Sequence, residues 1–175
     1  MTKHKVKHPN LYEVNTRVLL SRYKKGQHRA TLTDIPDSYW QNLAERGMDW
    51  IWLMGVWTLK EKQINPNLIP GNMMAEFKEL LPDLTEEDID GSTYAIDDYT
   101  VDPVIGGETE LIEVRKKLSK LGMHLMLDFV PNHYGAHTHF IHSNPEYFIE
   151  IDSSALQDNF PNALTHNHLL QLYHQ

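Results

Sequence analysis

The alternation of apolar and polar positions predicts a strand, a helix and a second strand in the first third of the chain. Residues 14–20 are rich in β-branched and apolar side chains, which is typical of a strand. A helical repeat begins at Asp34 and ends at Gly47. Residues 48–57 are almost entirely apolar on both alternating faces, as in a parallel strand that is covered on two sides. Together they predict one βαβ unit.

The same pattern returns after Gly106. A helix is predicted up to Gly122, because its leucines share one face and its acidic and basic residues lie early and late, as the helix dipole favours. Residues 124–130 then predict a third strand, and no further strand is visible beyond Pro131. This order indicates an α/β fold with parallel strands. Between the two halves lies a long insertion, residues 58–91, with a short helix expected at 73–80.

Composition and charge narrow the class of protein. The 175 residues are 41% apolar and carry 16 basic and 24 acidic side chains, a formal charge of −8, which argues against a nucleic-acid partner. Cysteine is absent, so disulfides and thiolate metal sites are excluded. The longest apolar stretch is far too short to span a membrane, and no secretory signal precedes it. We expect a soluble, cytoplasmic chain with no membrane partner.

Three polar side chains lie at the end of the predicted third strand or just after it. Asp128 stands near the strand end, and Asn132 and His133 lie in the loop beyond it. The carboxyl ends of parallel strands form the ligand crevice of α/β proteins. A binding role and a purely structural role, with Asp128 paired and His133 in a loop, both fit this pattern.

The segment 93–103 combines two tyrosines, Tyr94 and Tyr99, with three carboxylates, Asp97, Asp98 and Asp102. Aromatic faces beside hydrogen-bonding acids suit a sugar. The alternative is that the tyrosines pack and the acids form turns.

A third candidate is a zinc site in the histidine cluster 133–142, built from His133, His137, His139 and His142. No phosphate-binding loop or nucleophile elbow is present.

The first two candidates, in this order, resemble the α-amylase superfamily of glycoside hydrolases and transglycosylases. Residues 128–133 match its Asp-x-x-x-Asn-His motif at the end of the third barrel strand, and residues 94–103 resemble the segment before that strand. The resemblance covers residues 10–150, and the tail 164–175 is expected to fall outside it. It implies an incomplete (β/α)₈ TIM barrel of about three strands.

The resemblance also implies roles for individual residues. Tyr94 would be the aromatic platform under the sugar beside the scissile bond, and His133 would donate to hydroxyls of that sugar. Asp128 would be a buried acid that holds the site together. Asn132 corresponds to a calcium ligand in many family members, so calcium is the one cofactor implied for a full-length parent.

The family's catalytic residues are missing from these 175 residues. Retaining hydrolysis needs a carboxylate nucleophile and a separate acid/base, which the family places on later strands, the nucleophile within Gly-x-Arg-x-Asp. No such pattern occurs here. We therefore expect a truncated α-amylase-like enzyme, from a premature stop, a frameshift or a partial gene, that is inactive alone on α-glucans or α-glucosides.

The expected organisation follows from this resemblance. Residues 1–10 are a disordered N-terminus, 11–133 a partial catalytic barrel with the insertion, and 134–175 an irregular tail. Two other functions stay open at this point. One is a non-catalytic carbohydrate-binding or partner module, and the other is a small zinc-dependent hydrolase that uses the histidine cluster.

Overall fold

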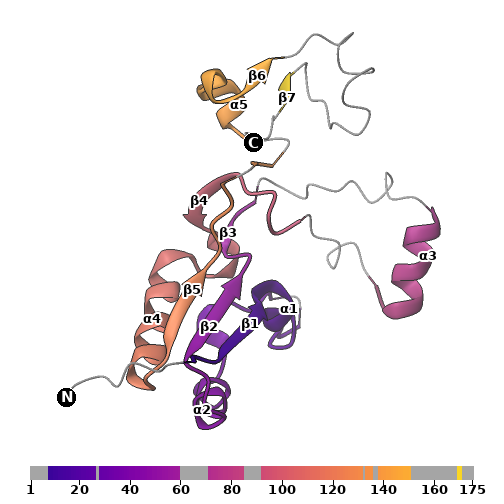
Figure 1. Ribbon diagram of the computed structural model, residues 1–175. Helices are drawn as coiled ribbons and strands as arrows, with labels where there is room; N and C mark the ends of the chain where they lie inside the picture. Colours follow the sequence, from indigo (N-terminus) through magenta and orange to yellow (C-terminus); the bar gives the residue numbers. More distant parts are fainter. Residues whose placement is uncertain are drawn as a thin grey trace. The chain divides into compact units, whose positions relative to one another are not determined.

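The computed structural model describes residues 8–26, 28–59, 71–84, 92–131, 133–135, 138–150 and 169–170 (Figure 1). The chain divides into two compact units. The first is formed by residues up to 58 together with 100–129, and the second by residues 59–99 together with 130–175. The division of the chain at residues 10 and 133 stays a prediction.

A three-stranded parallel sheet is the centre of the first unit. Its strands β1 (Leu11–Asn15), β2 (Trp50–Met54) and β5 (His124–Leu127) lie in the order β1-β2-β5. In this register Val14 is opposite Leu53, and Leu53 is opposite Leu127. The prediction of three parallel strands in an α/β fold is confirmed. The strands are shorter than the apolar runs, since Gly55, with φ +77°, ends β2.

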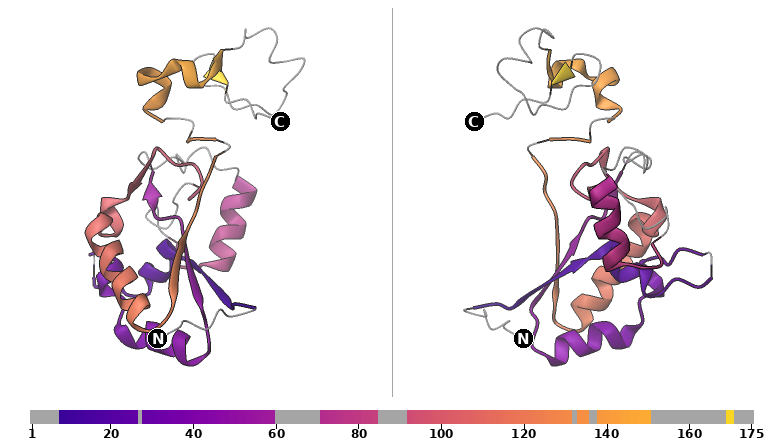
Figure 2. Two further views of the ribbon diagram at one scale, coloured as in Figure 1. Left: turned by 60° about the vertical axis from the view of Figure 1, so that its left-hand side comes forward. Right: turned by 90° about the vertical axis from the view of Figure 1, so that its right-hand side faces the viewer.

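Two helices complete the core of the first unit. Helix α4 (Gly107–Lys120) packs against β5 and against α2 (Asp37–Glu45), and Figure 2 shows α4 alongside β5 in both views. Both helices were predicted. The largest side chains of this core are completely or almost completely buried: Leu32, Ile35, Trp40, Ile51, Leu53, Val56, Val114 and Leu118. Burial of this apolar surface is what stabilises the unit.

The predicted first strand, residues 14–20, is wrong from residue 16 onward. Residues Thr16–Ser21 form helix α1 instead of continuing β1. The side chain of Asn15 caps this helix by accepting a hydrogen bond from the backbone N–H of Val18 at 3.2 Å. Leu19 and Leu20 are buried, so a helical turn places them in the core that an extended chain was expected to reach. Local capping and tertiary burial thus override β propensity here.

A short strand that the sequence did not predict follows the insertion. Strand β4 (Asp98–Val101) pairs with β3 (Trp57–Thr58), where the hydroxyl of Thr58 lies 2.9 Å from both the carbonyl and the hydroxyl of Thr100. A 3-10 helix, Pro103–Ile105, comes next, and Asp102 caps it by accepting from the N–H of Val104. These elements are too short for an apolar repeat to be visible.

The second unit contains helix α3 (Gly71–Leu80), which confirms the short helix expected at 73–80. Its other elements are α5 (Phe140–Ser143), a 3-10 helix at Pro145–Tyr147, and the antiparallel strands β6 (Ile149–Glu150) and β7 (Leu169–Leu170). The expectation of no strand beyond residue 131 is therefore wrong. These strands are only two residues long, which is too short for a pattern of apolar residues to reveal them. No helix among the described residues is long and apolar enough to cross a membrane.

Candidate functional site

Asp128 is a buried acid at the carboxyl end of β5, with 7% of its surface exposed. Its Oδ1 accepts a hydrogen bond from the indole Nε1 of Trp52 at 2.7 Å, and its Oδ2 accepts from the backbone N–H of Gly55 at 2.6 Å. Both donors come from β2 or the turn after it, so the acid joins two neighbouring strand ends. Gly55 has a positive φ that a side chain would strain, and its N–H faces the carboxylate as a result.

Two further contacts fix the backbone around this acid inside the first unit. The indole of Trp57 donates to the carbonyl of Asp128 at 3.0 Å. The guanidinium of Arg17 contacts the carbonyl of Trp57 at 3.4 Å and forms an ion pair with Asp102 at 2.6 Å. This ion pair is largely buried, with side chains 12% and 8% exposed. Asp128 therefore stands in a rigid polar frame in which both of its carboxylate oxygens already have donors.

Tyr94 and His133 belong to the second unit, on loops that the structure joins. Tyr94 is half-buried and its backbone N–H contacts the hydroxyl of Ser92 at 3.3 Å. The loop of His133 is tied to the segment after Tyr94 by a hydrogen bond from the N–H of Gly135 to the carbonyl of Ile96, at 2.7 Å. Ile96 is fully buried, which anchors this junction. The two residues come from segments about 40 positions apart and are brought together by this pairing.

The His133 ring is half-buried, and its Nδ1 is buried without a hydrogen-bond partner among the described residues. Such atoms are uncommon in folded proteins, because a buried polar atom without a partner costs free energy. The imidazole has a second nitrogen, and each can donate or accept according to the tautomer.

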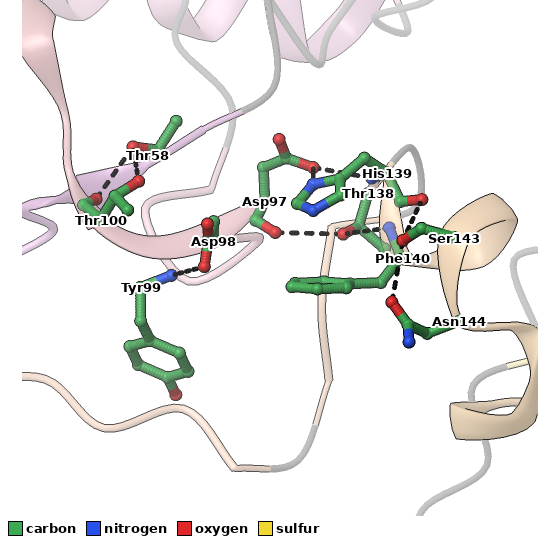
Figure 3. A network of polar contacts seen from close by, with 10 residues as sticks. All are labelled: Thr58, Asp97, Asp98, Tyr99, Thr100, Thr138, His139, Phe140, Ser143 and Asn144. Carbon is green, nitrogen blue, oxygen red and sulfur yellow. Dashed lines mark hydrogen bonds and ion pairs between the residues drawn. The ribbon is translucent and has the colours of Figure 1, made fainter.

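The carboxylates of the segment 93–103 have local structural contacts. Asp98 accepts from the N–H of Tyr99 at 2.6 Å, and Asp102 caps a 3-10 helix and pairs with Arg17. Asp97 accepts from the N–H of His139 at 2.9 Å, as Figure 3 shows. These contacts support the structural alternative for the acids. The hydroxyl of Tyr99 accepts from the N–H of Val130 at 2.6 Å.

The phenol of Tyr134, which follows His133, lies in partly buried and acidic surroundings. Burial raises the pKa of Tyr134, and the neighbouring Tyr99 and the negative charge of Asp98 raise the pKa further. The Tyr134 hydroxyl therefore keeps its proton to a higher pH than an ordinary tyrosine does. Its ring contacts that of Phe140, with centroids 5.2 Å apart.

Metal binding finds no support among the described residues. They contain no group of three or more His, Asp or Glu side chains that could hold a metal ion. His139 contacts Asp97 with a ring nitrogen at 3.3 Å. Asn132, the residue implied as a calcium ligand, and His137 of the zinc candidate lie outside the described residues. No step proposed below passes through calcium or zinc.

Sequence reasoning missed the residues that hold the site in place. Trp52 was part of an apolar strand, and nothing in that run distinguished an indole that donates to Asp128. Thr138 is 1% exposed and donates to the carbonyl of Asp97 at 3.1 Å, yet it stood among histidines that drew attention to metal. Nothing in the sequence around Thr138 indicated that its side chain would be buried or would donate to Asp97.

Comparison with known proteins decides the family. A family model of the α-amylase catalytic domain matches residues 37–171, well over half of the chain. The chain belongs to the α-amylase family. Its three parallel strands with covering helices are accordingly an incomplete portion of that family's TIM barrel, as the resemblance implied. The match reaches residue 171, so the expectation that the whole tail 164–175 falls outside the family is wrong.

Solved structures agree on the fold. An α-amylase from Lactobacillus plantarum is 20% identical with a TM-score of 0.58, and the match covers 94% of this chain and 32% of that one. The maltogenic α-amylase AmyB from Thermotoga neapolitana is 19% identical with a TM-score of 0.57, covering 94% and 31%. Trehalulose synthase MutB is 20% identical with a TM-score of 0.52, covering 82% and 22%. The chain thus spans about a third of the first two. No curated protein matches it significantly.

Proposed function

We propose that these 175 residues form the sugar-binding first part of an active site for α-glucans or α-glucosides, and that they catalyse no turnover by themselves. Tyr94 stacks under the sugar ring beside the scissile bond, and His133 donates to hydroxyls of that same sugar. Asp128 does not react, and instead holds the ends of β2 and β5 together.

The observation that carries the proposal is the junction between the loops of Tyr94 and His133. An aromatic platform and a hydroxyl donor can serve one sugar only if they come from neighbouring segments, because a sugar presents its C–H face and its hydroxyls within one ring. The backbone bond between Gly135 and Ile96 supplies this proximity.

The frame around Asp128 supports a structural role for this acid. A carboxylate that accepts from both an indole and a backbone N–H is held in one orientation. Inactivity of the chain alone follows from what it lacks. Retaining glycosidases use two carboxyl groups about 5 Å apart, and no Gly-x-Arg-x-Asp segment occurs in the sequence.

Calorimetric titration of the purified chain with maltooligosaccharides tests the binding roles. We expect saturable, millimolar binding that Tyr94→Ala weakens at least about fivefold, since an aromatic contact with the sugar face is lost. The control is Tyr147→Ala, which removes an exposed tyrosine of the same unit. His133→Ala is expected to weaken binding about threefold to tenfold, the value of a hydrogen bond to a buried donor, with the exposed His142→Ala as its control.

Starch and maltooligosaccharide hydrolysis assays on the same preparations test the absence of turnover. Product formation above background by the purified chain would contradict the proposed inactivity. Binding that is equal in the wild type and in Tyr94→Ala would remove the platform role. A chain that folds by circular dichroism but gives no saturable heat would sink the sugar-binding proposal as a whole.

A further inference from the structure

Asp97 connects the two loops of the proposed sugar site through both its side chain and its backbone. Its Oδ1 accepts from the backbone N–H of His139 at 2.9 Å and lies 3.3 Å from the Nδ1 of the same histidine. Its carbonyl accepts from the hydroxyl of Thr138 at 3.1 Å. Figure 3 shows these contacts running from the segment before β4 to the start of α5. We refer to these three contacts as the Asp97 bridge.

Loss of the Asp97 bridge should cost free energy, because two of its residues are largely buried. Thr138 is 1% exposed, and the side chain of Asp97 is 16% exposed. Helix α5 begins after His139, and the hydroxyl of Thr138 accepts from the N–H of its first residue, Phe140, at 3.4 Å. The carboxylate of Asp97 accepts from the N–H of His139, the residue just before this helix and 42 positions further along the chain. Removing it leaves a backbone N–H without its acceptor.

The bridge also complements the backbone junction already described. Gly135 bonds to Ile96, and Thr138 and His139 bond to the next residue, Asp97. The segment 133–139 is thus attached at both of its described ends to residues 96–97. His133 lies at the start of this segment, and Tyr94 lies two residues before Ile96.

We propose that Asp97 is a positioning residue of the sugar site. It does not touch the sugar; it holds the loop of His133 beside the loop of Tyr94, so that both side chains contact one ring. This inference rests on the proposed function, because it names a residue on which that site depends. Without the bridge, the loop spends part of its time in conformations that cannot bind, and the measured affinity falls by that fraction.

The neighbouring carboxylate provides a matched control. Asp98 differs from Asp97 by one position and has the same charge, but its described hydrogen bond goes to the N–H of Tyr99, the next residue. Asp97→Ala removes the side-chain contacts to His139, whereas Asp97→Asn keeps an oxygen that accepts from the backbone N–H. The pair separates the geometry of the contact from its charge.

The test measures maltotriose affinity and backbone amide exchange on the full chain in four forms: wild type, Asp97→Ala, Asp97→Asn and Asp98→Ala. We expect Asp97→Ala to weaken binding by roughly tenfold, about the value of a lost charged hydrogen bond, and to accelerate exchange at Gly135 and His139. Asp97→Asn should restore most of the affinity. Asp98→Ala should bind as the wild type does and leave exchange at Gly135 and His139 unchanged.

The outcomes separate this inference from the proposed function. Undiminished affinity for maltotriose in Asp97→Ala overturns the inference that Asp97 positions the loop. An equal loss of affinity in Asp98→Ala also overturns it. If the wild type binds no maltotriose, the proposed function fails. Amide exchange then decides whether Asp97 holds the loop: unchanged exchange at His139 overturns this, and faster exchange confined to residues 133–139 supports it. If Asp97→Ala does not fold, Asp97→Asn decides, because recovery of fold without loss of affinity is what the bridge requires.

Discussion

The two units of this chain are stabilised in different ways. The first has a continuous apolar core in which a parallel sheet and two helices bury side chains such as Trp40, Ile51 and Leu118. In the second unit, Ile96 is the one buried apolar side chain among the described residues. Hydrogen bonds of Gly135 and Thr138 join the segments beside it. The first unit resembles a scaffold, and the second resembles loops held by polar contacts.

This difference separates stability from binding. Apolar burial stabilises cooperatively, whereas segments with few buried apolar contacts open at lower free energy. The two proposed sugar contacts, Tyr94 and His133, lie in the second unit. Substitutions in the core should therefore change the free energy of unfolding, and substitutions in the polar contacts should change affinity first.

The largest expected effect comes from the apolar core. Trp40→Ala should lower the free energy of unfolding by about 3–5 kcal/mol, because it removes a fully buried ring and leaves a cavity. Urea denaturation followed by far-UV circular dichroism measures this. Trp40→Phe is the control: the indole N–H has no partner among the described residues, so phenylalanine loses volume without losing a hydrogen bond. A loss below about 1 kcal/mol in Trp40→Ala would contradict the description of this core as the source of stability.

A smaller effect is expected from the ion pairs of the same unit, and it depends on burial. Arg17→Met should destabilise by about 3 kcal/mol, because Asp102 stays behind as a buried charge without its partner. Lys117→Ala removes a similarly short contact to Asp37, at 2.7 Å. In this pair, however, the side chain of Lys117 is 33% exposed and that of Asp37 is 68% exposed. Its cost should be about 0.5 kcal/mol or less.

The double variant Arg17→Met with Asp102→Asn sharpens this comparison. Removing both charges should recover part of the loss, since the penalty comes from the unpaired carboxylate. Equal losses in the Arg17 and Lys117 variants, measured by the same urea titration, would show that burial does not set the value of these pairs.

The smallest effect is confined to alkaline pH. Burial, and next the adjacent Tyr12, raises the pKa of Tyr39 to about 12 from an ordinary value of 10.0. The unfolded chain loses this proton first, so the stability that the protonated phenol contributes is present below pH 10 and is lost as the pH rises to about 12. The free energy of unfolding of Tyr39→Phe should therefore fall less steeply between pH 10 and about 12 than that of the wild type, and it should change little at pH 7.

Ultraviolet absorbance of the tyrosinate form, recorded during a pH titration, measures the ionisation directly. One tyrosine should ionise near pH 12 in the wild type and be missing from the Tyr39→Phe titration. An unchanged titration would place the high pKa on a different tyrosine. Tyr134 of the second unit is the nearest comparison, since burial and the charge of Asp98 also raise its pKa.

Much of the fold could be predicted because its signals are local. The repeats of α2 and α4 and the apolar runs of β2 and β5 lie within short windows, and each appears in the structure. Helix α1 could not be predicted, because residues 16–21 favour a strand by propensity and are helical only where Asn15 caps them and the core takes Leu19 and Leu20. Strand β4 was missed for the same kind of reason, since its partner β3 lies about 40 residues earlier.

The candidate site was predicted as a set of residues and not as an arrangement. Tyr94, Asp128 and His133 could be chosen from their motifs, and the family they indicated is confirmed. Their sugar-binding roles stay predictions. The donors to Asp128 and the contacts of Asp97 gave no signal, because a tryptophan in an apolar run and an acid in a loop have many possible partners.

The amino-acid sequence by itself determined the order of the three parallel strands and of helices α2 and α4, the α/β class and the family, since periodicity and motif spacing are properties of neighbouring residues. Only the tertiary structure decided which polar groups meet. Arg17 and Asp102 are 85 positions apart, and Asp97 and His139 are 42 apart. Such pairs form because packing of the core and pairing of the strands bring their backbones together, and no local preference of either residue specifies the other.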